Sequence, residues 1–453
     1  MNLPNYFLAD LPDSKVVTSL VLVEACQTLK RNRERYLQNR STQSLIRVIS
    51  TVAKSWLDSD DPFRKYALEF GPARTGFSRP TLEAGLDSFF KQITPETLQA
   101  LLMQDLGDPQ RLDSLCANVH EQKLNRASSV RSPELLAHIT GGVLPNPTIT
   151  SMILGLLARS AQFVKCARGT SFLPRIFAHS IYEAEPKLGA CMEIAEWKGG
   201  TEPLENALFA EADLVTATGS DETLKNICSR IPFGTRFLGY GQRVSFGYVT
   251  QEILSGMNPQ KVVRNAARDV TAWDQLGCLS PHVFFVEGAG KISAEQFAEM
   301  LAGELERMEQ TEPRGKLSVE KSADIAFRRS FYEVRSGSSP DTKLWQSADS
   351  TAWTVIFEKD PRFQLSCLNR FIYVKEVADL TQALQGTDAV RGKISTVGIA
   401  ATEDKTQMLA NQLAQWGVTR ICPLGQMQTP SLLWRHDGRP SLEDLVTWTD
   451  WEM

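Results

Sequence analysis

The chain has 453 residues, of which 42% are hydrophobic and 23% are charged, and its formal net charge is −4. This length exceeds what one hydrophobic core supports, so we expect two or three domains. The small negative charge gives no reason to expect nucleic-acid binding. The most apolar stretch, 149–166, is interrupted by Arg159 and Lys165, which excludes a membrane-spanning helix there. The first residues lack the pattern of a signal peptide, so we expect a cytoplasmic protein.

The cysteine and histidine spacing argues against a metal site. Eight cysteines are scattered without a C-x-x-C pair, and the five histidines lie far apart in the sequence. This pattern fits neither a zinc site nor a disulfide framework. We therefore expect no metal.

Cys278 is the cysteine with the most chemical content. A helical pattern ends at Gly277, and an apolar run, 283–286, begins shortly afterwards. A thiol at such a helix-to-strand turn is held by the backbone on both sides and can be directed at a substrate. Its reactivity requires an electropositive and partly open setting. The alternative, a small buried hydrophobic residue, stays open at this point.

Residues 1–130 are expected to be mainly helical. Apolar residues recur at spacings of three and four in 17–29, 44–57 and 79–90. Thr94 followed by Pro95 predicts an N-cap and the first residue of another helix. No chemistry is indicated in this region.

From residue 131, predicted strands alternate with predicted helices. The strands are expected at 161–165, 191–197, 214–217 and 236–240, and the helices at 149–158, 204–212 and 222–230. This order indicates a parallel sheet covered on both faces, which binds ligands beyond the carboxyl ends of its strands.

The turn of Thr218, Gly219 and Ser220 follows one of these strands and opens a helix. Glycine permits close approach of a ligand, and the helix N-terminus offers N–H groups to a phosphate. Ser220 could equally be only an N-cap. The G-x-G-x-x-G fingerprint is absent.

The second half predicts another α/β unit. Asn258 and Pro259 begin the helix that leads to Cys278, and Ser293 with Gln296 forms a capping box for the next helix. The polar stretches 309–322 and 336–343 are expected to be loops. Strands and helices then alternate at 370–374, 378–384, 393–400, 404–416 and 418–423.

Several short motifs are spread along the chain in a particular order. They are Thr75-Gly76-Phe77-Ser78, His138-Ile139-Thr140-Gly141-Gly142-Val143, Ala217-Thr218-Gly219-Ser220, Tyr240-Gly241-Gln242-Arg243-Val244-Ser245, Gln275-Leu276-Gly277-Cys278-Leu279-Ser280-Pro281, Gly417-Val418-Thr419-Arg420 and His436-Asp437-Gly438-Arg439-Pro440. Together they resemble the aldehyde dehydrogenase superfamily, and within it the LuxC-type long-chain fatty acyl-CoA reductases of bacterial bioluminescence. The resemblance covers nearly the whole chain.

The resemblance implies an aldehyde dehydrogenase-like α/β fold with two doubly wound α/β domains. A helical N-terminal region, 1–130, would pack on a nicotinamide cofactor-binding domain, 131–250. A catalytic domain, 251–425, would carry the cysteine. The C-terminal segment, 426–453, would return to the cofactor domain or to an oligomer interface.

The resemblance also implies site residues. Cys278 corresponds to the family's nucleophile, and Lys165 to the lysine that meets the adenosine ribose or its 2′-phosphate. Thr218, Gly219 and Ser220 correspond to the turn near the cofactor phosphates and nicotinamide. Arg168 adds a second positive charge that suits a 2′-phosphate, which favours NADPH, with NADH as the alternative.

Two positions depart from the pattern of ordinary aldehyde oxidisers. Their glutamate that activates water has no counterpart in 237–241, which reads FLGYG. An acyl-enzyme without a base for water survives to be reduced. Their oxyanion-holding asparagine is replaced by Gly142, which leaves the backbone N–H groups of Gly141, Gly142 or Cys278 as candidate donors.

The implied activity is that of an acyl-CoA reductase. Cys278 would take the acyl group from a long-chain acyl-CoA, and NADPH would reduce the S-acyl enzyme to an aldehyde. The alternatives are reduction of an acyl phosphate or an acyl-protein, a cysteine thioesterase, and a non-catalytic cofactor-binding subunit. His138 and His282 are alternative proton donors, but we expect each to be a structural or surface histidine. The expected partners are acyl-CoA, an acyl-transferring or acyl-activating protein, and further copies of the chain.

Overall fold

The structure is a computed structural model that describes residues 3–12 and 15–452. The chain forms two compact units, which are described separately. Unit 1 comprises Met1–Thr75, Leu86–Gly241 and Ser431–Met453, and unit 2 comprises Gly76–Gly85 and Gln242–Pro430. The division after Gly241 corrects the boundary expected at residue 250, because the strand Val244–Val249 belongs to unit 2.

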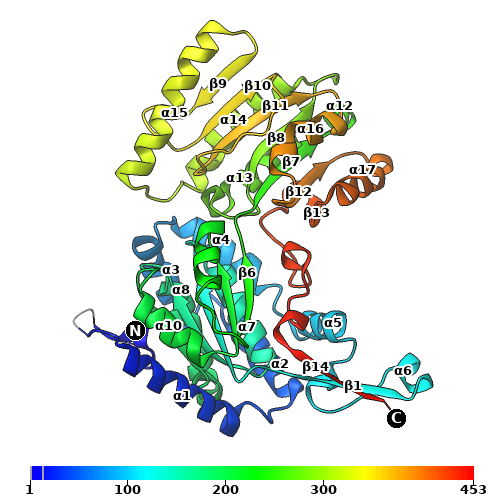
Figure 1. Ribbon diagram of the computed structural model, residues 1–453. Helices are drawn as coiled ribbons and strands as arrows, with labels where there is room; N and C mark the ends of the chain where they lie inside the picture. Colours follow the sequence, from blue (N-terminus) through cyan, green and yellow to red (C-terminus); the bar gives the residue numbers. More distant parts are fainter. Residues whose placement is uncertain (1–2, 13–14, 453) are drawn as a thin grey trace. The chain divides into compact units, whose positions relative to one another are not determined.

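Unit 1 is built on a five-stranded parallel sheet. The strand order is β4-β3-β2-β5-β6, so the order reverses between β2 and β5. The edge strand β6 is labelled in Figure 1. The strands are β2 (Leu135–Thr140), β3 (Ala161–Cys166), β4 (Met192–Glu196), β5 (Leu214–Thr218) and β6 (Arg236–Tyr240). The point where the order reverses is where open α/β sheets leave a crevice for a ligand.

Helices cover both faces of this sheet. Helices α1, α10 and α11 share one apolar core with the sheet, while α7 and α8 contact the opposite face and α2 packs on them. The helices are α1 (Ser19–Tyr36), α2 (Thr42–Ser55), α3 (Pro62–Thr75), α5 (Pro95–Leu106), α6 (Val119–Lys123), α7 (Pro145–Leu157), α8 (Phe172–Ala184), α9 (Pro186–Gly189), α10 (Glu202–Glu211) and α11 (Asp221–Cys228). Helix α4 (Arg79–Phe90) is divided between the two units after Gly85. Thr94 caps α5 as predicted.

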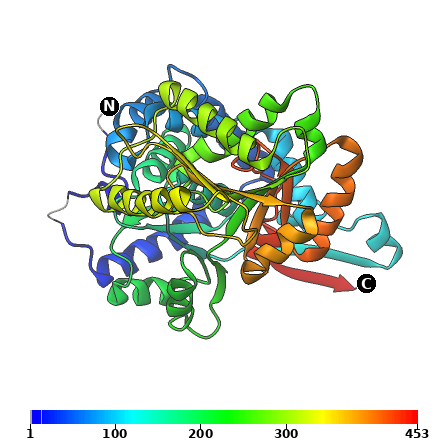
Figure 2. The ribbon, with the colours of Figure 1, turned by 90° about the horizontal axis from the view of Figure 1, so that it is seen from above.

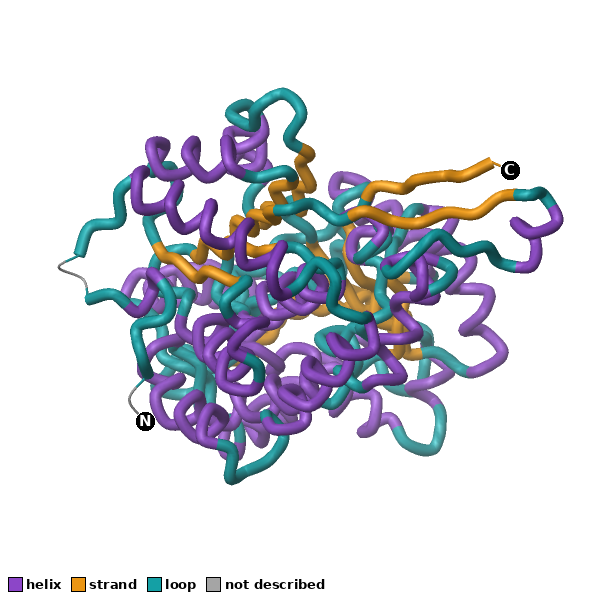
Figure 3. Tube along the Cα trace, turned by 90° about the horizontal axis from the view of Figure 1, so that it is seen from below, coloured by secondary structure: helices purple, strands orange, loops and turns teal. Residues whose placement is uncertain are grey.

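The N-terminal region is not helical throughout. Residues Arg126–Arg131 form strand β1, which pairs antiparallel with β14 (Thr447–Glu452) from the end of the chain (Figure 3). The C-terminal segment therefore returns to unit 1. This pairing corrects the expectation of helix up to residue 130.

Unit 2 contains a seven-stranded sheet of order β13-β12-β7-β8-β11-β10-β9. All neighbouring strands are parallel except β9, which runs antiparallel to β10. The strands are β7 (Val244–Val249), β8 (Pro281–Glu287), β9 (Thr342–Gln346), β10 (Thr354–Glu358), β11 (Phe371–Val377), β12 (Ile394–Ala400) and β13 (Arg420–Pro423). Strands β7, β8 and β10 are buried along their full length, as expected of central parallel strands.

Helices also cover both faces of the unit 2 sheet. Helices α13 and α14 pack on one face, and α15, α16 and α17 pack on the other; α14 and α15 lie on opposite sides in Figure 2. The helices are α12 (Gln251–Ser255), α13 (Pro259–Thr271), α14 (Ala294–Thr311), α15 (Val319–Ser338), α16 (Leu380–Thr387) and α17 (Glu403–Trp416). The predicted caps at Asn258 and Ser293 are present.

Helix α15 was not predicted. It includes residues 319–322 and 336–338, which belong to the two stretches, 309–322 and 336–343, that we expected to be loops. The buried part of this helix is small, Ile325, Arg329 and Tyr332, so the sequence shows a weak apolar stripe.

Within residues 3–12 and 15–452, no helix has the length and hydropathy that crossing a bilayer requires.

Candidate active site

Cys278 lies in unit 2, between a short 3₁₀ turn (Ala272–Gln275) and β8, and it is exposed. Its carbonyl oxygen accepts a hydrogen bond from Ser245 Oγ at 2.8 Å. Ser245 Oγ in turn accepts the N–H of Thr396 at 3.1 Å. The backbone of the cysteine is thus tied to the amino ends of β7 and β12, while the residue itself reaches solvent.

Arg420, at the start of β13, provides positive charge near this cysteine. Burial lowers the pKa of its guanidinium, and Cys422, Asp269 and Cys278 act in the opposite direction. The guanidinium also donates to the carbonyl oxygens of Met427 (2.7 Å) and Gln426 (2.8 Å). A cation near a thiol makes its surroundings electropositive. This is the electropositive setting that a reactive thiol requires.

The other cysteines differ from Cys278. Burial raises the pKa of six of them: to about 12 for Cys26, Cys166, Cys191 and Cys422, to about 11 for Cys367, and by a smaller amount for Cys116. Cys228 is exposed at the end of α11. Cys228 and Cys278 are the two exposed cysteines, and of these two only Cys278 is among the groups that raise the pKa of Arg420.

The glycine loop after β2 meets the turn after β5 at the point where the strand order of unit 1 reverses. The Gly141 N–H donates to Thr218 Oγ1 at 2.9 Å. A Cβ on residue 141 would lie 2.6 Å from the Thr218 carbonyl oxygen, so only glycine fits there. This N–H is therefore committed to Thr218. Gly142, with φ of +86°, has open space around it.

The turn of Thr218, Gly219 and Ser220 has a regular cap geometry. Ser220 Oγ accepts the N–H of Thr223 at 3.2 Å and is the N-cap of α11. The Gly219 N–H donates to the carbonyl oxygen of Tyr240, at the end of β6, at 3.2 Å. The capping role of Ser220 is therefore present, and a ligand contact through the backbone remains compatible with it.

Lys165 and Arg168 lie at the carboxyl end of β3. Lys165 is buried, and desolvation lowers the pKa of its amine, while Glu205 and Glu196 act in the opposite direction. Its Nζ lies 5.8 Å from the ring centroid of Trp197. Arg168 is exposed in the following loop.

Glu196, at the end of β4, holds the loop that carries Arg168. Its carboxylate accepts the N–H groups of Gly169 (2.7 Å) and Ser171 (3.2 Å) and the Ser171 hydroxyl (2.5 Å). Glu205 is likewise engaged, by the N–H of Gly200 and by Arg230. Both carboxylates near Lys165 thus have partners within unit 1.

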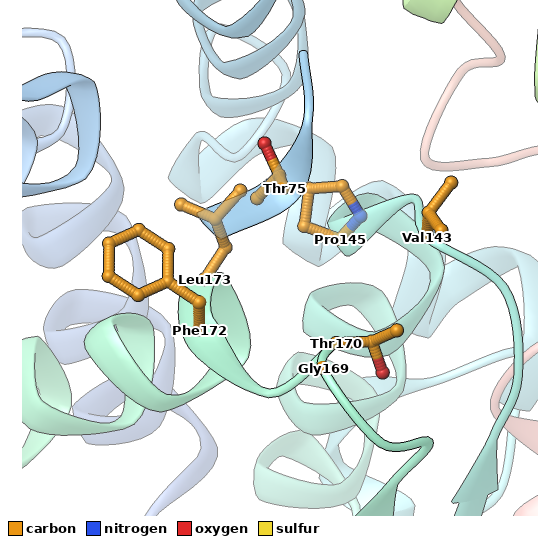
Figure 4. Close-up of a pocket in the computed structure, with 7 residues that line it drawn as sticks. All are labelled: Thr75, Val143, Pro145, Gly169, Thr170, Phe172 and Leu173. Atoms are coloured by element: carbon orange, nitrogen blue, oxygen red, sulfur yellow. The ribbon is translucent and has the colours of Figure 1, made fainter. Parts of the chain in front are cut away.

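A small pocket lies beside these two loops (Figure 4). It is lined by Thr75, Val143, Pro145, Gly169, Thr170, Phe172 and Leu173. The pocket therefore touches both the glycine loop after β2 and the loop after β3, and it belongs to the same edge of the sheet.

His138 and His282 are both buried. His138 bonds Thr216 at 2.7 Å and Gln162 at 3.1 Å, and the Nδ1 of His282 accepts the N–H of Ser366 at 3.1 Å. Burial lowers the pKa of each imidazole to about 4. Both rings are thus neutral at pH 7 and serve the packing of their sheets.

The C-terminal segment adds an aromatic cluster that sequence reasoning missed. The His436 ring stacks on Tyr240 with centroids 4.6 Å apart, and Trp434 lies on His436 at 4.7 Å. Arg439 lies 5.6 Å from the Tyr240 ring centroid. Because Tyr240 also accepts from Gly219, the cluster supports the turn after β5.

In the described ranges, no three His, Cys, Asp or Glu side chains group as a metal-ligand set.

Solved structures that superpose on this chain include aldehyde dehydrogenases. A bifunctional proline utilization A protein superposes with a TM-score of 0.73 at 14% identity, over 96% of this chain and 45% of that one. An NAD-dependent benzaldehyde dehydrogenase from Corynebacterium glutamicum gives 0.69 at 14% identity, over 96% and 91% of the two chains. The fold is that of the aldehyde dehydrogenase superfamily.

Within that superfamily, the family model "Acyl-CoA reductase (LuxC)" matches residues 37–448, and the chain belongs to this family. The long-chain acyl-protein thioester reductase of Aliivibrio fischeri is 22% identical over 323 residues, which cover 70% of this chain. The match spans 63% of the length of that relative. The predicted family and fold class are confirmed.

Proposed function

We propose that the protein reduces a long-chain acyl thioester, acyl-CoA in the first place, to a fatty aldehyde, with NADPH as the reductant. The observation that carries the proposal is Cys278, exposed at the turn before β8, with its backbone carbonyl held by Ser245. The family match supports the same reaction class.

Cys278 performs the first step. Its thiolate attacks the acyl carbonyl carbon, the carbon–sulfur bond to CoA breaks, and CoA leaves as a thiolate while an S-acyl enzyme forms. We expect Arg420, whose guanidinium pKa Cys278 raises, to supply positive charge near the thiol. The backbone N–H of Cys278 is the proposed oxyanion donor, and that of Gly141 is committed to Thr218 within unit 1.

The S-acyl enzyme persists because no carboxylate stands in β6, where ordinary aldehyde oxidisers carry their base. Water then lacks a positioned proton acceptor, and hydrolysis is slow. Reduction of the thioester gives a hemithioacetal on Cys278, which collapses to the aldehyde and regenerates the thiolate.

The residues at the carboxyl edge of the unit 1 sheet fit a nicotinamide dinucleotide, which supplies the hydride when bound. Gly142 has open space around it, and the N-terminus of α11, which follows the turn Thr218–Ser220, presents backbone N–H groups. Lys165 and Arg168 are the proposed partners of the ribose and its 2′-phosphate. The carboxylates of Glu196 and Glu205 bond their own loop and Arg230, respectively. Neither forms an ion pair with Lys165 or Arg168 in the interactions described above.

A second acyl donor is favoured by one observation. The relative in Aliivibrio fischeri is named a long-chain acyl-protein thioester reductase, so an acyl group on a partner protein is the alternative substrate. The chemistry at Cys278 would be the same, because both donors are thioesters.

The test is incubation with radiolabelled palmitoyl-CoA without cofactor, followed by NADPH. We expect label on the wild type, none on Cys278→Ala, and release as palmitaldehyde. Release as free palmitate would indicate a thioesterase. Label from palmitoylated acyl carrier protein but not from palmitoyl-CoA would assign the acyl-protein substrate, and no label from either would indicate a non-catalytic subunit.

A further inference from the structure

Two short segments of unit 2 have an unusual backbone conformation. Trp273, Asp274 and Gln275 have φ of 53°, 50° and 64°, and Leu368, Asn369 and Arg370 have φ of 62°, 56° and 65°. Six non-glycine residues thus lie in the left-handed region, in two runs of three. Single residues adopt this region occasionally, but consecutive ones are strained. The first run ends three residues before Cys278.

The two segments hold each other through buried side chains. Arg370 forms an ion pair with Asp274, with Nη2 to Oδ1 at 2.8 Å and Nε to Oδ1 at 3.0 Å. Gln275 bonds both backbone groups of Phe371: its Oε1 accepts the N–H at 2.8 Å, and its Nε2 donates to the carbonyl oxygen at 2.9 Å. Asp274, Gln275 and Arg370 are at most 3% exposed. Asp274, Gln275, Arg370 and Phe371 are called the clasp below.

Further contacts fix the clasp on all sides. Arg370 also bonds Glu309 and the carbonyl oxygen of Glu312, each at 2.8 Å, and Asp274 Oδ2 accepts the N–H of Gly315 at 3.0 Å. The Trp273 ring occupies the space where a Cβ on Gly85 would lie, at 2.1 Å. Gln275 Nε2 donates to the Pro281 carbonyl oxygen at 2.8 Å, on the far side of Cys278.

These contacts constrain the position of Cys278 more than they stabilise the sheet. Gln275 and Pro281 bracket the cysteine turn, so the bond between them sets the turn's width. A strained backbone persists only where the surrounding structure over-determines it, and such strain gathers at functional sites. Strand β8 pairs in regular register with β11, whereas its register with β7 shifts between Ser245 and Phe246, directly after the cysteine turn.

We propose that Asp274, Gln275 and Arg370 are positioning residues that fix where the Cys278 thiolate points. The proposal rests on the proposed function, in which Cys278 is the nucleophile. Displacing a nucleophile by about 1 Å costs a rate of the order of 100-fold, so the effect belongs to the acylation step and not to cofactor binding.

The test compares Arg370→Lys and Asp274→Asn with Glu358→Gln in the full chain. Glu358 forms a similarly buried ion pair with Lys375 of β11, away from the cysteine turn, and serves as the matched control. The measurements are the rate of acyl-enzyme formation from palmitoyl-CoA, the KM for NADPH, the thermal midpoint, and hydrogen–deuterium exchange of the peptide 276–282. Rates are taken well below the midpoint of each variant.

We expect Arg370→Lys to slow acylation by about 100-fold and Asp274→Asn by about tenfold, with the KM for NADPH unchanged within about twofold. Exchange in 276–282 should rise in both. Glu358→Gln should lower the midpoint while acylation stays within about threefold of wild type. Acylation equally unaffected in all three variants, or equally slowed in all three, would overturn the proposal.

The exchange measurement separates this inference from the proposed function. If the wild type forms no acyl-enzyme at Cys278, the proposed function fails. Faster exchange of 276–282 in the clasp variants alone would still support the role of the clasp in holding the turn, and unchanged exchange would contradict it.

Discussion

Two turns of this protein carry its proposed chemistry, and they are supported in different ways. The turn Thr218–Ser220 follows the carboxyl end of a parallel strand and is completed by an N-cap and two backbone-directed hydrogen bonds. The Cys278 turn precedes the amino end of a strand and is held by buried charged and amide side chains from remote segments.

The difference follows from what each turn presents. A helix N-terminus binds an anion through its own N–H groups, which the local backbone already directs outward. A nucleophilic side chain must be held at one position relative to its substrate, and a short loop cannot do this alone. The first turn is therefore nearly self-sufficient, while the second depends on its surroundings.

The largest expected effect is at Cys278. Cys278→Ala should lower reductase activity by roughly 1000-fold or more, because the covalent step is lost. The activity is measured as NADPH oxidation with palmitoyl-CoA, and the acyl adduct is followed by mass spectrometry. Cys228→Ala, at the other exposed cysteine, should retain full activity. Equal loss in both variants would contradict the assignment.

The next effect tests the cofactor side. Lys165→Met and Arg168→Met should raise the KM for NADPH by about tenfold or more, since each removes a charge-assisted contact with the cofactor. With NADH, Arg168→Met should change the KM by less than about twofold, because the 2′-phosphate is missing. Similar changes for both cofactors would show that Arg168 does not meet the 2′-phosphate.

The charge beside the cysteine gives a pH prediction. Cys278 is among the groups that raise the pKa of Arg420, so we expect removal of this cation to move thiolate formation at Cys278 to higher pH. In Arg420→Gln, the pH midpoint for alkylation by iodoacetamide should rise by about one unit. Arg420→Lys should keep most of the wild-type profile. Arg391→Gln, which removes a surface arginine over Trp416, is the control. A midpoint unchanged in Arg420→Gln would exclude this role.

The smallest expected effect is at Ser220. It tests whether the Ser220 hydroxyl only caps α11 or also contacts the cofactor. Ser220→Ala should reduce the free energy of unfolding by about 1 kcal/mol through loss of the α11 cap. Its KM for NADPH should rise by less than about threefold, because backbone groups would make the cofactor contact. Ser318→Ala removes the matching cap of α15 and should cost similar stability with no change in KM. A tenfold rise in KM for Ser220→Ala alone would show that the hydroxyl meets the cofactor.

The sequence by itself determined the elements whose signals are local. Periodicity and caps located α4, α5, α13 and α14 because apolar spacing and N-cap side chains act within one or two turns of chain. The alternation of strands and helices indicated the parallel sheet of unit 1 and a second α/β unit, whose sheet also contains the antiparallel strand β9. The turn after β5 was found for the same reason, since its glycine and cap residue are adjacent in sequence.

Only the tertiary structure decided the rest. Strand β1 pairs with β14 from the opposite end of the chain, and α15 is helical although few of its residues are buried. Asp274 and Gln275 lie just before Cys278 in the sequence. Their partners, Arg370 and Phe371, lie almost one hundred residues away. Left-handed conformations at ordinary residues have no local sequence signal, because they exist only where distant contacts stabilise them.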